Sequence, residues 1–320
     1  MVLKTIYIVR HGFRSNWVVN PQTGAYSHTF PTPTGIPSDP SLASHGVEQS
    51  HDLARHLVSL QPPISAIYSS PFYRCLQTLS PTVTSLNATR ASSSLPPLPI
   101  RIDTGIGEFY GLARFDHPIP ASVEVLTTHF PGMLDEGYRG AIRPSVNGES
   151  IPGLHDRVAY ALEDIIRQLD GEGVEAAVLC THAAVMICAG RALTGRMPEE
   201  EGEEDFRCGT CAFSRFERRG GGEGKGEVKG EKKEWKEGEE VPDVGWRGKG
   251  VGGGWECMVN GDCSFLKEGE ERTWNFAMED TLAAQQERSF LNDPDSFNNP
   301  GTDSVVEREK AAHRKGSPRL

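Results

Sequence analysis

The most reactive combination of side chains in this sequence is Arg10-His11-Gly12-Phe13-Arg14, which directly follows an apolar run over residues 5–9. Such a run predicts a buried strand, and the end of a parallel strand is where open α/β sheets place their sites. A neutral imidazole can attack phosphorus when a hydrogen bond orients its other nitrogen. Arginine suits the phosphoryl oxygens, because its planar fork meets two of them at once. The segment therefore predicts phosphoryl chemistry at His11, although a structural histidine also fits so short a motif.

Two further polar residues follow apolar runs in the same way. Arg74 comes after the run at residues 64–68, in the first turn of a helix predicted over residues 71–87, and helix N-termini attract anions. His182 directly follows the run at residues 175–180. Taken alone, Arg74 could equally be a surface cation and His182 a packed core histidine. Both residues are candidates for binding phosphate.

A candidate proton donor stands in the sequence Gly-Glu-Phe-Tyr-Gly. Glu108 is flanked there by glycine and aromatic residues, and such surroundings could raise the pKa of a carboxyl group toward that of a general acid. A loop glutamate in water is the plain alternative. Glu149, in the sequence Gly-Glu-Ser, is the next candidate for the acid.

Short apolar segments alternate with segments of helical periodicity over much of the chain. The predicted strands are residues 5–9, 64–68 and 175–180. The predicted helices are residues 45–60, 71–87 and 152–169. Ser70 and Pro71 suit the N-cap and first position of the second helix, and Ser150 suits the N-cap of the third. This alternation predicts an α/β protein, a three-layer α/β/α sandwich with a largely parallel central sheet.

The composition changes sharply between residues 220 and 254, which are rich in glycine, lysine and glutamate. This segment predicts a disordered low-complexity insertion that buries little. Its flanks, residues 210–217 and 255–260, alternate like two neighbouring edge strands. Residues 283–320 form a polar tail that is also predicted to be disordered. We therefore expect one domain over residues 1–282, interrupted by the insertion.

Charge and composition argue against several classes of protein. The formal net charge is −11, from 33 Lys and Arg against 44 Asp and Glu, which argues against direct nucleic-acid binding. The longest apolar stretch, residues 174–193, contains Glu175, His182 and Arg191 and is not predicted to cross a membrane. The N-terminal apolar run is too short for a signal peptide. With seven scattered cysteines, a disulfide framework is not indicated, so we expect a cytoplasmic or nuclear protein.

Two other clusters in the sequence could form binding sites. Four thiolates could bind Zn²⁺, from Cys208, Cys211, Cys257 and Cys263, but ordinary buried thiols explain these residues more simply. The acidic run at residues 199–205 could dock a basic partner, although a solvated loop is the simpler interpretation.

The four motifs occur together and in one order, as Arg-His-Gly-x-Arg, Ser-Ser-Pro-x-x-Arg-x-x-Gln-Thr, Gly-Glu-Phe-Tyr-Gly and Thr-His-Ala. Over residues 3–218 the chain thereby resembles the histidine phosphatase superfamily, whose fold is called phosphoglycerate mutase-like. The opening motif and the late segments Gly-Asp-Cys-Ser-Phe-Leu and Glu-Arg-Thr-Trp-Asn-Phe resemble one branch in particular. That branch includes the phosphatase-like subunit of fungal transcription factor tau and the ecdysteroid-phosphate and suppressor-of-T-cell-signalling phosphatases.

The resemblance implies a role for each motif residue. His11 matches the nucleophile that becomes phosphohistidine, and Glu108 stands where the family places its proton donor. The phosphate-binding core is matched by Arg10, Arg14, Arg74 and His182. The family needs no metal and no organic cofactor.

Two functions from different classes follow from these observations. The first is a phosphomonoesterase that acts on a phosphorylated small molecule or phosphoprotein. The alternative is an interaction subunit of a transcription-factor-type complex with little or no catalytic role. Protein partners or a homodimer are compatible with both functions, whereas a phosphoglycerate mutase is disfavoured because residues 109–147 lack an obvious match to that branch.

Overall fold

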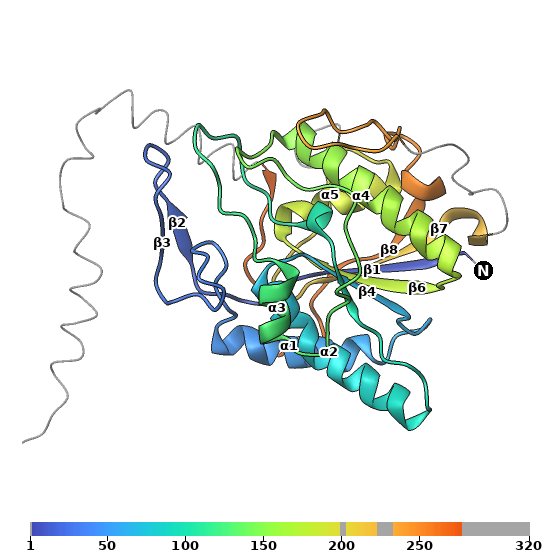
Figure 1. Ribbon diagram of the computed structural model, residues 1–320. Coiled ribbons are helices and arrows are strands. Elements are labelled where there is room, and N and C mark those ends of the chain that lie inside the picture. Colours follow the sequence, from blue (N-terminus) through green and yellow to red (C-terminus); the bar gives the residue numbers. More distant parts are fainter. Residues whose placement is uncertain (1, 199–202, 223–232, 277–320) are drawn as a thin grey trace, which may run out of the picture. The chain divides into compact units, whose positions relative to one another are not determined.

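The computed structural model describes residues 2–198, 203–222 and 233–276 and is built around a six-stranded sheet with the order β5-β4-β6-β1-β7-β8 (Figure 1). Its strands are β1 (Thr5–Arg10), β4 (Ala66–Ser69), β5 (Ile100–Ile102), β6 (Ala176–Thr181), β7 (Phe213–Arg218) and β8 (Trp255–Asp262). The first four are parallel to one another, whereas β7 is antiparallel to both of its neighbours. A separate ribbon consists of β2 (Trp17–Val19) and β3 (Tyr26–His28). All residues of β4 and β6 are buried, because helices cover both faces of the sheet.

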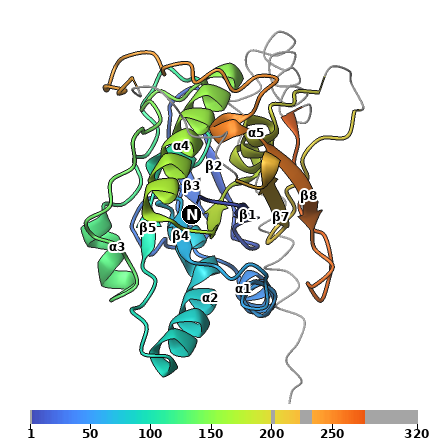
Figure 2. The ribbon, with the colours of Figure 1, turned by 90° about the vertical axis from the view of Figure 1, so that its right-hand side faces the viewer.

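Helices form the two outer layers. They are α1 (Ser44–Leu57), α2 (Tyr73–Ser92), α3 (Val123–His129), α4 (Ile151–Glu172) and α5 (Ala183–Thr194). The helices α1 and α2 pack together on one face of the sheet, and α4 and α5 pack together on the other (Figure 2). The N-cap predicted for α4 is confirmed, since the Ser150 hydroxyl accepts a hydrogen bond from the Gly153 amide at 3.1 Å. The predicted three-layer α/β/α sandwich is thus confirmed.

The start of α2 differs from the prediction. The helix begins at Tyr73, two residues later than expected, and the Phe72 that precedes it makes no side-chain cap. The carboxylate of Asp39 accepts hydrogen bonds from the Tyr73 amide at 2.9 and 3.1 Å. Ser70 is engaged elsewhere, with its hydroxyl 2.7 Å from Nε2 of His182. An acceptor distant in sequence therefore replaces the local cap.

Residues 233–254 correct the predicted disordered insertion at 220–254. Trp246 and Val251 are buried, each with 1% of its surface exposed. Three more apolar residues of the segment pack against buried residues of the domain: Trp235, Val241 and Val244 contact the cluster of Ile142, Tyr160 and Ala161. The prediction failed because the high glycine and charge content hides a few large apolar side chains. Residues 223–232 lie outside the described part of the chain.

We expect Trp246→Ala to lower the free energy of unfolding by about 3–5 kcal/mol, as is usual for a large buried aromatic residue. The indole stacks on His155 with 5.8 Å between ring centroids, so truncation would leave a cavity against α4. Urea denaturation measures the change. The matched control is Lys249→Ala, an exposed position of the same segment, where the change should stay within about 0.5 kcal/mol. Equal, small changes for both variants would mean that the segment does not contribute to the core.

The compact unit that carries the sheet ends at Trp274. The predicted tail at 283–320 lies outside the described residues, as do residues 199–202 of the acidic run. Of the remaining acidic residues of that run, Asp205 pairs with Arg191 at 2.6 Å. Part of the acidic run is therefore engaged within the domain.

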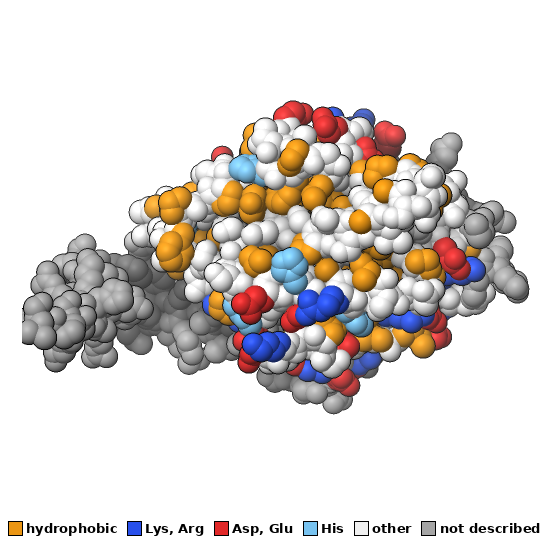
Figure 3. Space-filling model, turned by 90° about the horizontal axis from the view of Figure 1, so that it is seen from below, with side chains coloured by type: hydrophobic (Ala, Val, Ile, Leu, Met, Phe, Trp, Pro, Cys, Tyr) orange, Lys and Arg blue, Asp and Glu red, His pale blue; other side chains and the backbone are white. Residues whose placement is uncertain are grey.

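The helices and the surface bear on two classes that the sequence argues against, membrane-spanning proteins and nucleic-acid-binding proteins. In the described ranges, no helix is long and apolar enough to cross a membrane. On the face formed by α1 and α2, acidic and basic side chains are intermixed (Figure 3). This face therefore does not present a basic stripe of the kind that follows a nucleic-acid backbone.

Candidate active site

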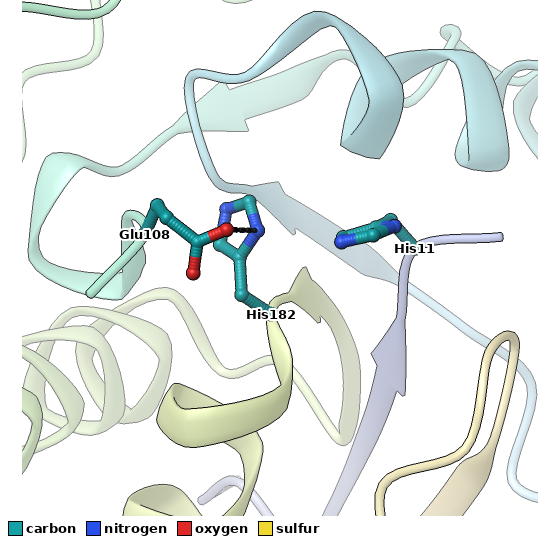
Figure 4. A group of neighbouring side chains, drawn as sticks. All are labelled: His11, Glu108 and His182. Carbon is teal, nitrogen blue, oxygen red and sulfur yellow. Dashed lines mark ion pairs between the residues drawn. The ribbon is translucent and has the colours of Figure 1, made fainter. Parts of the chain in front are cut away.

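The ends of the parallel strands bring together the residues singled out in the sequence. His11 follows β1, His182 follows β6 and forms the N-cap of α5, and Arg74 lies in the first turn of α2. Glu108 follows β5 through the short 3-10 helix η1 (Thr104–Ile106). One ligand atom from each of His11, Glu108 and His182 lies within 4.8 Å of the others (Figure 4).

The environment of His11 makes it a neutral imidazole. Its side chain is buried, and its Nδ1 lies 2.8 Å from the carbonyl oxygen of Gly12. A carbonyl can only accept a hydrogen bond, so Nδ1 carries the proton and Nε2 keeps its lone pair. Burial holds the pKa of His11 well below 6.5, and the nearby charges of Arg74 and His182 lower it further. The ring is therefore prepared to act as a nucleophile through Nε2.

Arg74 is completely buried, which excludes the alternative of a solvated surface cation. Its Nη2 donates to Oε2 of Glu108 at 2.7 Å, and its Nη1 donates to the Ser38 carbonyl at 3.0 Å. Although burial lowers the pKa of Arg74, the carboxylates of Glu108 and Asp39 raise it. Its buried Nε has no partner among the described residues. Arg74 is thus a charged group with an unused donor.

Arg10 and Arg14 extend this cationic surface. Burial lowers the pKa of both guanidinium groups, and the positive charge of Arg74 lowers both further. The Nε of Arg10 is buried and, in the part of the chain that is described, unpartnered. Crowded, partly unsatisfied guanidinium groups gain from an anion placed between them. The arrangement therefore suits an anion bound between the guanidinium groups.

Glu108 corrects one expectation from the sequence. Its Oε2 lies 2.7 Å from Nη2 of Arg74 and 3.2 Å from Nδ1 of His182. Although burial raises the pKa of Glu108, His182 and Arg74 hold it well below 4.5. The expectation of a raised pKa is therefore wrong, because the charges of residues distant in sequence outweigh the local aromatic surroundings.

His182 is buried between three elements of the fold. Burial lowers its pKa, but Cys75 and Glu108 raise it, and the net direction is upward. A protonated His182 donates from Nδ1 toward Glu108 and from Nε2 toward the Ser70 hydroxyl. The sequence reasoning missed Ser70 and Cys75 as partners of this imidazole, although both stand in the motif that contains Arg74.

A sequence profile of the histidine phosphatase superfamily (branch 1) matches residues 6–227, which include every one of these side chains. The chain belongs to the histidine phosphatase superfamily. It is 34% identical over 289 residues to the transcription factor tau 55 kDa subunit of Saccharomyces cerevisiae, with 86% of this chain and 59% of the relative covered. It is 26% identical over 223 residues to the ecdysteroid-phosphate phosphatase of Drosophila melanogaster, with 62% of this chain and 28% of the relative covered. The chain therefore spans less than two thirds of each relative.

Among solved structures, this chain is similar to the ecdysone phosphate phosphatase from Bombix mori in complex with tungstate, with a TM-score of 0.48 and 16% sequence identity. The match covers 67% of this chain and 88% of that structure.

Glu149, the second candidate for the proton donor, forms an ion pair elsewhere in the domain. Its carboxylate pairs with the buried Arg157, whose Nε lies 3.0 Å from both oxygens. Arg157 also donates from Nη1 to the carbonyls of Gly105 and Gly107, at 2.8 and 3.2 Å. The pair thus holds the turn that precedes Glu108, and Glu108 remains the candidate acid.

The four cysteines proposed as an alternative zinc site do not converge. Within the described ranges, the group His11, Glu108 and His182 is the one set of possible metal ligands that lie close together. Cys208 donates from its thiol to the Trp274 carbonyl at 3.2 Å, and Cys257 donates to the Val259 carbonyl at 3.3 Å. The interpretation of these cysteines as ordinary thiols accounts for their contacts.

Proposed function

We propose that this chain is a phosphomonoesterase that transfers a phosphoryl group first to His11 and then to water. The observation that carries the proposal is a neutral, buried imidazole whose Nε2 keeps its lone pair, close to the charges of three arginines. Two of those arginines, Arg10 and Arg74, have a buried Nε–H without a partner among the described residues, so each has a donor to offer to an oxyanion.

In the first half-reaction, the phosphoryl oxygens bind the guanidinium groups of Arg10, Arg14 and Arg74 and the imidazolium of His182. His11 Nε2 then attacks phosphorus in line with the ester oxygen, so a P–N bond forms while the P–O bond breaks. Fixed cations stabilise the charge on the equatorial oxygens without reorganising, and this electrostatic effect is usually the largest in phosphoryl transfer.

Glu108 supplies the proton that the leaving oxygen needs. His182 and Arg74 lower the pKa of this carboxyl group and favour its ionised form. A bound phosphoryl dianion offsets both positive charges and repels the carboxylate, and both effects raise the pKa of Glu108. Substrate binding thus favours the protonated acid. After it has lost its proton to the leaving group, the same carboxylate activates the water that hydrolyses phosphohistidine.

The leaving group would occupy a cavity of about 640 Å³ beside Glu108. Phe72 and Glu108 belong to its wall, and most of the other lining side chains are apolar, among them Tyr110, Ile119, Tyr138, Ile142 and Trp235. Because the acid must touch the leaving oxygen, the cavity that shares Glu108 is the natural place for the remainder of the ester. We therefore propose an apolar or aromatic alcohol as the leaving group.

A second candidate function is that of an interaction subunit in which catalysis is marginal. It is favoured by the 34% identity to a transcription factor tau subunit, which would also place the chain in the nucleus. Under this proposal the chain would elute from cell extract only together with partners. The purified chain would show no saturable phosphate release.

The assay that tests the proposal is phosphate release from a panel of aryl, steroid and alkyl phosphates and phosphopeptides by the purified chain. We expect saturable hydrolysis that vanadate inhibits. The pKa of His11 lies well below 6.5, first because of burial and then because of Arg74, so the imidazole stays unprotonated as the pH falls toward that value. The acid limb of kcat/KM that belongs to His11 should therefore lie below pH 6.5. An absence of turnover with every substrate would favour the interaction subunit.

A further inference from the structure

The late segment Glu271-Arg272, which follows β8, contacts the loop that carries His11. It lies beyond residue 227, where the superfamily match ends. Arg272 accepts a hydrogen bond through its carbonyl from Nη1 of Arg10 at 2.6 Å. Its guanidinium lies over the ring of Phe13, with 3.8 Å from Cζ to the ring centroid. We call residues 270–274 the strap.

The contacts to Arg10 fix the direction of its guanidinium group. Nη1 of Arg10 donates both to Arg272 and to the Cys208 carbonyl, the latter at 2.7 Å. Two carbonyl oxygens therefore fix Nη1 of Arg10, while its buried Nε has no partner in the described residues. These carbonyls do not contact Nε, which stays available as a donor. By fixing Nη1, the strap therefore determines the position from which Arg10 can donate to a phosphoryl oxygen.

Glu271 ties the strap to the same loop by a second route. Its carboxylate accepts from Nε2 of Gln49 at 2.9 Å and lies 2.5 Å from Nε2 of His45, both on α1. The other end of the Gln49 amide accepts from the Phe13 main-chain amide at 2.9 Å. Gln49 is buried, so it connects the strap to the loop without competition from water.

The main chain completes the attachment. The Glu271 carbonyl accepts from the Thr210 amide at 2.9 Å, which anchors the strap to the segment that supplies the Cys208 carbonyl. Arg272 has a φ of +47°, in the left-handed region that residues with a side chain rarely adopt. Such a conformation persists where the surroundings hold it in place, and it is often found next to functional sites.

We propose that Glu271 and Arg272 are positioning residues for the phosphate site, acting through Gln49 and Arg10 on the loop that carries His11. The proposal rests on the proposed function, because it assigns these contacts to the binding and transfer of a phosphoryl group. Neither residue needs to touch the substrate.

The test is Glu271→Ala, with Glu270→Ala as the matched control. Glu270 is the preceding acid of the strap and pairs with the exposed side chain of Arg207. Both variants are compared with the wild type by their affinity for vanadate in calorimetry, by kcat on an aryl phosphate and by melting temperature. We expect Glu271→Ala to weaken vanadate binding and to lower kcat, each by about 10- to 100-fold, because small displacements of a binding group have effects of that order. Glu270→Ala should leave both unchanged, and Glu271→Gln, which keeps an oxygen acceptor for Gln49, should recover part of the loss.

The outcomes separate the proposal from a structural role and from the proposed function. A lower melting temperature for Glu271→Ala with unchanged vanadate affinity and kcat at a temperature where the variant is folded would overturn the positioning role. A wild type that binds vanadate but shows no turnover would refute the phosphatase, while the vanadate affinities of the variants would still decide the role of the strap. A wild type that binds no oxyanion would overturn both.

Discussion

Replacing His11 by alanine is expected to abolish phosphate release, with a loss of at least about 10³-fold, because no other group can take over the covalent step. His11 is the neutral imidazole near these arginines, and the cations alone do not provide a nucleophile. Initial rates on an aryl phosphate measure the loss. The matched control is His51→Ala, which replaces an exposed histidine of α1 and should leave the rate unchanged.

The same variant tests the intermediate. A phosphorylated substrate should leave acid-labile, base-stable label on the wild type and none on His11→Ala, as phosphohistidine requires. The side chain is buried, so the melting temperature is measured alongside to show that the variant is folded. Label that persists on the folded variant would mean that another residue is the nucleophile.

Changing Glu108 to glutamine is expected to slow hydrolysis of an alkyl phosphate by about 10²- to 10⁴-fold, the usual contribution of a general acid. An alkoxide is a poor leaving group and needs the proton. The kcat/KM for nitrophenyl phosphate, which reports phosphoryl transfer to His11 and not the later attack of water, should fall by less than about tenfold, because the phenolate leaves without protonation. Parallel measurements of kcat/KM on the two substrates give the comparison.

The pattern across substrates distinguishes the possible roles of Glu108. Equal loss of kcat/KM for both substrates would point to a structural role, through the contacts with Arg74 and His182, in place of proton donation. No slowing of either would show that the proton comes from another carboxylate. Glu124→Gln, at an exposed position of α3, serves as the control and should affect neither substrate.

The elements that the sequence predicts well are those whose signal is local. The strands β1, β4 and β6 appear within two residues of the predicted ends, because each is an apolar run buried on both faces. The strand β5 was missed, since its three residues include Arg101 and follow a proline-rich stretch. The ribbon of β2 and β3 was also missed, because each strand has only three residues and none of them is buried.

The candidate site shows the same division between local and distant causes. The strand-end positions of His11 and His182 can be read directly from the order of apolar runs and polar residues. The ionisation of Glu108 could not be predicted, because it depends on Arg74, which lies 34 positions away, and on His182. The roles of Ser70 and Asp39 were missed for a related reason, since their partners become visible only when the strands are paired.

The strap has a consequence for the order in which the candidate site is assembled. The hydrogen bond from Arg10 to Arg272 joins residues 262 positions apart, and β1 pairs with β6 and β7, which are both encoded far downstream. Contacts of such separation form slowly, because a long stretch of chain must be ordered before they are made. During synthesis, the first strand and its histidine emerge from the ribosome long before their partners exist. The nascent chain therefore carries His11 early but completes the candidate site among the last of its tertiary contacts.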